Sequence, residues 1–125
     1  MAASYNTCLL IDDNYLDNFI TKKLLENSNF AKTVVTSESP AYAIRLLASG
    51  SVKPDVIFLD IRMPNMSGFE FLDAYDKLDI EKEGIKIYLL SSSFDPTDMK
   101  KSSNNKYVTH FIHKPLTHKI LEDLP

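Results

Sequence analysis

The sequence predicts a parallel α/β fold, in which five strands form one sheet with helices packed on both of its faces. Short apolar runs typical of buried strands alternate with longer helical segments along nearly the whole chain. This alternation predicts parallel strands joined by helices, because neighbouring parallel strands need a crossover connection. Right-handed crossovers leave few possible topologies. The length of 125 residues and the 44% hydrophobic content fit one domain with its own core.

The first half of the chain is expected to form three strands and two helices. The strands are short and rich in apolar or β-branched residues: Thr7–Ile11, Lys32–Thr36 and Asp55–Leu59. The first helix, Asn14–Asn27, has side chains spaced along one face, as in a helix that covers a sheet: Leu16, Phe19, Ile20, Lys23 and Leu24. The second helix begins with Ser39 as its N-cap and Pro40 at its first position, and Gly50 ends it.

The second half is expected to complete the sheet with two more strands. A third helix, Phe69–Leu78, follows Gly68 and leads to the strand Ile85–Leu90. The segment from Asp95 to Asp98 has the cap, the proline and the acidic third position that begin a fourth helix. The last two elements are the strand Tyr107–His113 and the short helix Thr117–Leu124.

The bulk composition excludes several classes of function. The net charge of −3 gives no basic footprint for nucleic-acid binding, and no apolar run approaches a membrane span. None of the three glycines belongs to a dinucleotide-binding or P-loop motif. The single cysteine, Cys8, cannot form an internal disulfide, and we expect a buried, inert thiol in a reducing cytoplasm. The chain has no basic, apolar N-terminal signal peptide.

Acidic residues follow two of the predicted strands. Asp12 and Asp13 close the first apolar run, and Asp60 closes the third. Ligands of open α/β sheets bind beyond the carboxyl ends of the strands, so neighbouring strands would bring these three carboxylates together. Carboxylates that are close repel one another, and a hard divalent cation would relieve the repulsion. The pattern therefore predicts a cation site.

Two later strands also end in polar residues, Ser91 and Lys114. Each residue taken alone has an ordinary structural explanation, because acids and serines cap helices and turns, and a lysine is usually solvated. Together, polar residues at the ends of four strands form a much more specific pattern than any one of them: Asp12 and Asp13, Asp60, Ser91, and Lys114.

Together these motifs resemble the receiver domain of two-component response regulators. The resemblance covers essentially the whole chain, so one receiver domain is expected over residues 1–125. It is carried by four segments: Leu10-Ile11-Asp12-Asp13-Asn14, Leu59-Asp60-Ile61-Arg62-Met63-Pro64 with Ser67-Gly68, Leu89-Leu90-Ser91-Ser92, and His113-Lys114-Pro115. The resemblance implies a flavodoxin-like, doubly wound sheet of five strands in the order 2-1-3-4-5, with the switch point between strands one and three. It also implies a cis peptide bond before Pro115.

The resemblance implies a role for each acidic residue. Asp60 would accept a phosphoryl group from a histidine kinase. Asp13 and Asp60 would bind Mg²⁺ directly, Asp12 would act mainly through water, and the backbone carbonyl of Arg62 would complete the protein ligands. Such a chain is a substrate for phosphotransfer, with autocatalysed uptake and loss of phosphate, more than a turnover enzyme.

The resemblance also implies a switch. Lys114 would neutralise a phosphoryl oxygen and the Ser91 hydroxyl would bind another. Phe111 would occupy the aromatic switch position; the alternative is a plain core residue on the last strand. The partner-binding face that responds would be built by the fourth helix, the fifth strand and the fifth helix. The expected partners are a histidine kinase or a histidine phosphotransfer protein and a downstream target or output domain, with phosphorylation-dependent dimerisation as an option. No partner nucleic acid or membrane is expected for this domain.

Alternatives stay open from the sequence alone. A degenerate receiver that acts as a constitutive interaction module would carry the same fold. A dehalogenase-type phosphatase also uses an aspartate at a strand end, but it needs a second acid where this chain has Arg62. Arg62 could shield the phosphate, pair with a nearby acid or simply be solvated. His110, His113 and His118 are interpreted as structural or surface residues, because imidazole-binding metals do not suit an acidic pocket.

Overall fold

The structure is a computed structural model that describes residues 3–93 and 95–125. Five parallel strands form one sheet in the order β2-β1-β3-β4-β5, which confirms the predicted fold class and topology. The strands are β1 (Tyr5–Ile11), β2 (Ala31–Ser37), β3 (Val56–Asp60), β4 (Lys86–Ser91) and β5 (Val108–His113). The helices are α1 (Tyr15–Asn27), α2 (Pro40–Ser49), α3 (Gly68–Asp76), α4 (Pro96–Ser103) and α5 (His118–Asp123).

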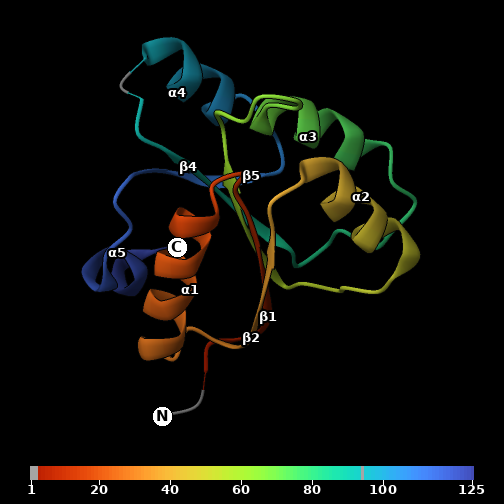
Figure 1. The fold of residues 1–125 in the computed structure, drawn as a ribbon. Coiled ribbons are helices and arrows are strands. Elements are labelled where there is room, and N and C mark those ends of the chain that lie inside the picture. The colour runs from red at the N-terminus through yellow and green to blue at the C-terminus, as the bar shows by residue number, and fades with distance from the viewer. Residues whose placement is uncertain (1–2, 94) are drawn as a thin grey trace.

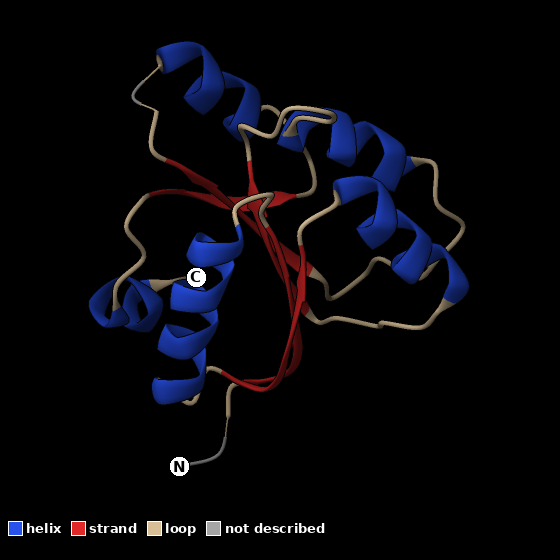
Figure 2. Cartoon of the chain, viewed as in Figure 1, coloured by secondary structure: helices blue, strands red, loops and turns tan. Residues whose placement is uncertain are grey.

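Helices cover the two faces of the sheet in separate groups. In Figure 1, α1 and α5 lie on one side of the strands and α2 and α3 on the other, and the strands stand between them in Figure 2. The side chains of β1 alternate between the two layers: Leu9 and Ile11 join the α2–α3 core, whereas Cys8 and Leu10 join the α1–α5 core. The central strand β3 is buried along its full length, as expected for a strand with helices on both faces.

The predicted helix boundaries rest on observed caps. The Ser39 side chain accepts a hydrogen bond from the Tyr42 N–H at 3.1 Å, and Pro40 occupies the first turn of α2. Gly50 ends α2 in the left-handed conformation, with φ of 76°. At the start of α3, Ser67 and Glu70 form a reciprocal capping box that the sequence analysis did not identify.

The prediction for the face of α1 was wrong. Three of the side chains expected to cover the sheet are largely exposed, with relative accessibilities of 60% for Leu16, 48% for Phe19 and 57% for Ile20. The buried positions of α1 are Asn18 and Leu25. Periodicity located an apolar stripe correctly, but the helix presents most of that stripe to solvent, and only Leu24 packs against the α1–α5 core.

Among the helices of the described residues, none is both long and apolar enough to span a bilayer. The Lys114–Pro115 peptide bond is cis, as the sequence resemblance implied.

Gly68 is expected to be intolerant of a side chain, because a Cβ at this position would lie 2.7 Å from the carbonyl oxygen of Asp60 and 3.0 Å from the Ile61 Cα. Both neighbours are backbone atoms, so either α3 or the end of β3 must shift. We predict that Gly68→Ala lowers the free energy of unfolding by about 1–3 kcal/mol, measured by urea denaturation. Asp73→Ala, at an exposed position of the same helix, should change it by no more than about 0.5 kcal/mol. Equal stability of the two variants would contradict this account of Gly68.

Candidate functional site

The register of the central strands brings the predicted acidic residues to one edge of the sheet. Ile11 of β1 pairs with Leu59 of β3, so Asp12 and Asp60 follow at the same level of adjacent strands. Both are buried, with relative accessibilities of 3% for Asp12 and 6% for Asp60, whereas Asp13 is exposed. Carboxylate oxygens of these three residues all lie within 4.8 Å of one another. This set of hard oxygen donors could hold a metal ion.

Lys114 reaches the same cluster from the end of β5. Its Nζ lies 3.0 Å from Asp12 Oδ2, 3.2 Å from Asp60 Oδ1 and 3.3 Å from Asp17 Oδ2. Asp17, in the first turn of α1, is a contact that the sequence analysis did not predict. No signal in the sequence pointed to this contact, because an acid in the first turn of a helix has an ordinary electrostatic explanation. The carboxylates outnumber this ammonium group, and the edge keeps an excess of negative charge.

The electrostatics of the cluster raise the pKa of both Asp60 and Lys114, which disfavours the charge on Asp60 and favours the charge on Lys114. Burial, followed by the charge of Asp12, raises the pKa of Asp60 to about 6, although Lys114 acts in the opposite direction. Burial alone would lower the pKa of Lys114, but the hydrogen bond and charge of Asp12, with those of Asp60, outweigh it and raise that pKa. Asp60 is therefore a carboxylate whose negative charge is incompletely balanced, beside a firmly protonated lysine.

Two asparagines fix the backbone around Asp12. Asn14, the N-cap of α1, donates its backbone N–H to Asp12 Oδ1 at 3.0 Å, and its own side chain caps the helix at Asp17 N. The buried Asn18 donates from Nδ2 to the Asp12 carbonyl at 2.7 Å. This bond explains why a polar residue occupies the inner face of α1, and why the apolar stripe predicted for that face points elsewhere.

Ser91 lies at the end of β4, fully buried, next to the strand that carries Asp60. Its hydroxyl accepts a hydrogen bond from the Ser93 N–H at 3.0 Å, so it is engaged with the following loop. His113 contacts the same loop, since its Nε2 lies 2.9 Å from the Ser93 carbonyl oxygen. Lys114 N in turn donates to the Ser91 carbonyl at 2.9 Å. The loop after β4 is thus tied to the end of β5 close to Lys114.

Phe111 is partly buried on β5. It packs against the α2–α3 core, and its ring meets that of His113 edge to face, with 5.3 Å between centroids. This ring contact of His113 was not predicted from the sequence.

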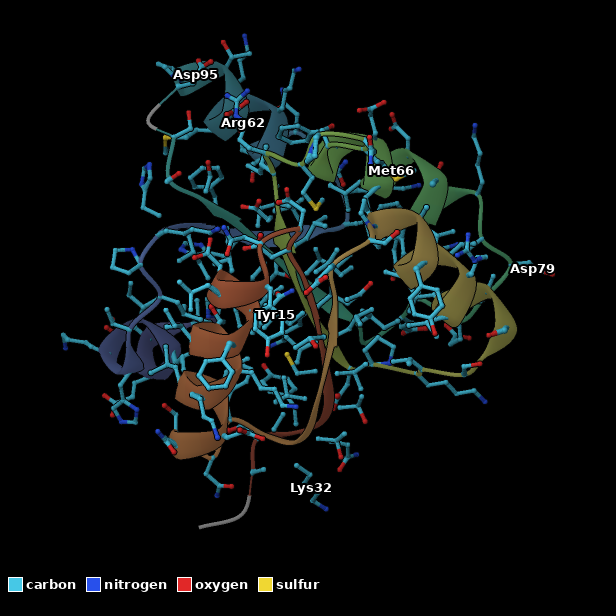
Figure 3. The ribbon with its side chains drawn as sticks, in the orientation of Figure 1. Tyr15, Lys32, Arg62, Met66, Asp79 and Asp95 are labelled. Atoms are coloured by element: carbon cyan, nitrogen blue, oxygen red, sulfur yellow. The ribbon has the colours of Figure 1, made fainter. Side chains whose placement is uncertain are left out.

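Arg62 does not join the carboxylate cluster through its side chain. Its Nη2 lies 2.6 Å from Asp98 Oδ2 on α4 and 3.8 Å from Asp95 Oδ2, the helix N-cap. The labelled Arg62 and Asp95 lie together at α4 in Figure 3. Of the possibilities left open for Arg62, the structure contains the ion pair with a nearby acid. Asp98, which the sequence analysis treated only as a helix-start acid, is the buried partner.

Comparison with known proteins agrees with the geometry. The family model described as response regulator receiver domain matches residues 8–124. A two-component response regulator of Cytophaga hutchinsonii has a solved structure that is 30% identical, with a TM-score of 0.84 over 95% of this chain and 92% of that one. A response regulator receiver protein of Dyadobacter fermentans is 32% identical, also with a TM-score of 0.84, over 94% and 92% of the two chains.

The matched segment makes up very different shares of the curated relatives. The two-component response regulator ARR17 of Arabidopsis thaliana is 30% identical over 118 residues, which cover 86% of this chain and 74% of the relative. A protein-glutamate methylesterase/protein-glutamine glutaminase of Burkholderia thailandensis is 39% identical over 70 residues, which are 56% of this chain but only 19% of that protein. The similarity to such longer proteins therefore concerns a small part of them.

The raised pKa of Asp60 predicts a pH-dependent stability. In the absence of metal, Asp60 has a pKa of about 6 in the folded state and 3.8 in the unfolded chain. Between these two pH values only the folded state keeps the proton, so the free energy of unfolding falls as the pH rises from 3.8 through about 6. Asp60→Asn removes this loss. We predict that its free energy of unfolding exceeds that of the wild type by about 1–2 kcal/mol at pH 7.5, and that the difference shrinks toward pH 4. Urea titrations of both proteins across this pH range, in the presence of a metal chelator, measure this difference. A difference that does not vary with pH would contradict the charge argument.

Proposed function

This chain belongs to the response regulator receiver family of two-component signalling, and we propose that Asp60 is the residue that accepts the phosphoryl group. The observation that carries the assignment is the position of Lys114 Nζ, 3.2 Å from the Asp60 carboxylate and 3.0 Å from that of Asp12. A strand-end carboxylate beside a fixed cation can act as a nucleophile and then have the charge of its product neutralised.

The proposed reaction is phosphoryl transfer from a phosphohistidine. A carboxylate oxygen of Asp60 attacks phosphorus, the bond from phosphorus to the donor's imidazole nitrogen breaks, and that nitrogen takes up a proton. The product is an acyl phosphate on Asp60. Positioning and charge stabilisation are most of what such a transfer requires from the protein.

We assign the cation site to Mg²⁺, held by Asp12, Asp13, Asp60 and the backbone carbonyl of Arg62. The donor set fits, because it consists of hard oxygens. Burial and, after it, the charge of Asp12 raise the pKa of Asp60, and a divalent cation would offset both effects on the carboxylate. When bound, Mg²⁺ would neutralise charge on the transferring group. Ionised Asp60 is the form that binds it, so metal affinity should rise with pH through about 6.

Ser91 and Phe111 are proposed to sense the phosphoryl group. The Ser91 hydroxyl would exchange its contact with Ser93 N for a phosphoryl oxygen. The room that it leaves can be taken by Phe111, whose ring is only partly buried. Phe111 has no hydroxyl, so its signal would pass through packing.

Several properties of the whole chain are part of the same proposal. We propose one receiver domain over residues 1–125, acting as a phosphorylated signalling domain instead of a turnover enzyme, in a reducing cytoplasm where the buried, unpaired Cys8 stays a thiol. A downstream target or an output domain would read its state.

The proposed donor is a protein, either a histidine kinase or a histidine phosphotransfer protein. Large apolar side chains are exposed on the first two turns of α1, which start just after the acidic pair, and Tyr42 of α2 is exposed as well. The exposed α1 set comprises Tyr15, Leu16, Phe19 and Ile20. In Figure 3 the ring of Tyr15 stands out from α1. An apolar patch beside a reactive site suits contact with another protein.

Incubation with acetyl phosphate tests the site itself. We expect intact-mass spectrometry to show the gain of one phosphoryl group in the presence of Mg²⁺ and no gain when a chelator removes the metal. Asp60→Asn should abolish the gain, whereas Asp79→Asn, at an exposed aspartate far along the chain, should leave it unchanged.

Two results would contradict the assignment. Phosphorylation that persists in Asp60→Asn would move the acceptor to another residue. A chain that binds Mg²⁺ but takes up no phosphate from acetyl phosphate or from any histidine kinase would be the degenerate receiver, acting as a constitutive interaction module.

The apolar α1 patch predicts a difference between protein and small-molecule donors. With a phosphorylated histidine kinase first shown to charge the wild type, we expect Phe19→Ser to slow transfer roughly tenfold, because it removes a contact of the docking surface. Uptake from acetyl phosphate should be unchanged. Met99→Ser removes a comparably exposed apolar side chain from α4 and serves as the control, with transfer from the kinase unchanged. Equal slowing with both donors would mean that the substitution damages the site, not the docking.

A further inference from the structure

Helix α4 lacks the apolar anchor that the other helices have. Each of α1, α2, α3 and α5 places at least one apolar side chain in a core cluster, but none of residues 96–103, all of which the structure describes, belongs to either cluster. The two buried residues of α4 are both polar, Asp98 and Ser102, and Met99 is 47% exposed. Hydrophobic burial therefore contributes little to holding this helix in place.

Polar contacts hold α4 instead. The Asp98 side chain is only 8% exposed. Within the described residues, the only partner of its carboxylate is Arg62 Nη2, at 2.6 Å. The same guanidinium lies 3.8 Å from Asp95, the N-cap of the helix. A third contact joins Lys101 to the Phe69 ring of α3, with Nζ 5.4 Å from the ring centroid. Figure 1 shows α4 at the end of α3 and away from α1 and α5.

The residue that anchors α4 is also close to the proposed phosphorylation site along the chain. Arg62 follows Asp60 by two residues, which span at most about 7 Å of extended backbone. Its side chain is 60% exposed, which leaves space on the solvent side for the guanidinium to turn. An arginine side chain at this position is long enough to reach either Asp98 or a group attached to Asp60.

We propose that Arg62 and Asp98 form a latch that phosphorylation of Asp60 opens, releasing α4. This inference rests on the proposed function, because it requires the phosphoryl group at Asp60. The phosphoryl group carries a charge of about −1.5 to −2 and three acceptor oxygens, and a guanidinium binds such a group through two parallel hydrogen bonds. The phosphoryl group and the Asp98 carboxylate thus compete for the Arg62 guanidinium. The phosphoryl group has the greater charge, so Arg62 turns toward it.

Loss of Arg62 has a large effect on α4 because Asp98 is buried. A buried carboxylate without its cation is strongly disfavoured, and it becomes solvated if the helix moves outward. With no apolar side chain in the core to oppose that movement, α4 loosens or shifts. The latch couples charge at the phosphorylation site to the position of one helix, by a route separate from Ser91 and Phe111.

Hydrogen exchange of α4, measured by mass spectrometry, tests the latch, with beryllium fluoride and Mg²⁺ as a stable mimic of the phosphoryl group. In the wild type, the mimic should speed exchange across residues 96–103 about tenfold. Asp98→Asn keeps the shape and removes the charge, so its α4 should exchange about tenfold faster without the mimic and change less than about twofold when the mimic is added. Asp95→Asn is the matched control, because asparagine also caps helices; it should behave as the wild type.

The outcomes separate this inference from the proposed function. Bound beryllium fluoride, detected by fluorine NMR, with unchanged α4 exchange would overturn the latch but not the assignment of Asp60. If circular dichroism shows that Asp98→Asn is folded, and its α4 exchanges as fast as that of the wild type, then the Arg62–Asp98 pair does not hold α4 in place. Failure of the mimic to bind would count against the proposed function and, with it, against the coupling.

Arg62→Lys provides a second variant. It keeps the charge but loses the bidentate geometry, and we expect its α4 to exchange at a rate between that of the wild type and that of Asp98→Asn.

Discussion

The attraction between Lys114 and the strand-end carboxylates is the interaction on which the site depends. The parallel sheet forces Asp12 and Asp60 to the same level of adjacent strands, and their charges repel one another. Lys114 comes from β5, which is separated from β3 by β4, and its ammonium group contacts both carboxylates. These contacts join residues far apart in sequence, so the site exists only when all the central strands are in register.

The charges of the lysine and the carboxylates do not cancel, and this imbalance makes the site sensitive to added charge. A single lysine shared among Asp12, Asp17 and Asp60 does not neutralise them all. The pKa of Asp60 is raised, first by burial and then by the charge of Asp12, even though Lys114 acts in the opposite direction. An edge with unbalanced negative charge attracts cations, and any change in charge there alters every contact that the ammonium group makes. The residues that fix the backbone, such as Asn18 on the Asp12 carbonyl, keep this arrangement in place without adding charge.

The sequence was sufficient to predict the sheet and the edge at which most of the candidate-site side chains lie, for physical reasons that also explain what it missed. Buried parallel strands read as continuous apolar runs, and their ends are marked by the change to Asp12, Asp60, Ser91 and Lys114. The orientation of α1 was not predictable in this way, because periodicity finds an apolar stripe but does not say whether solvent or sheet faces it. Asp98 reads locally as a helix-start acid, and only its distance to Arg62, which is 36 residues away, gives it a second role.

The identity of residue 111 makes the polar attachment of α4 more significant. Under the proposed switch, a phenylalanine could transmit a movement of Ser91 only by occupying or leaving space, and Phe111 already lies against the α2–α3 core and the His113 ring. Packing of this kind responds to shape, whereas the Arg62–Asp98 pair responds to charge, which is the property that phosphorylation changes most. A helix attached through charge and without apolar side chains in the core is the element of this fold best suited to respond to that change. The weak hydrophobicity of α4, which would be a defect in a purely structural helix, then has a physical rationale in the signalling role of the domain.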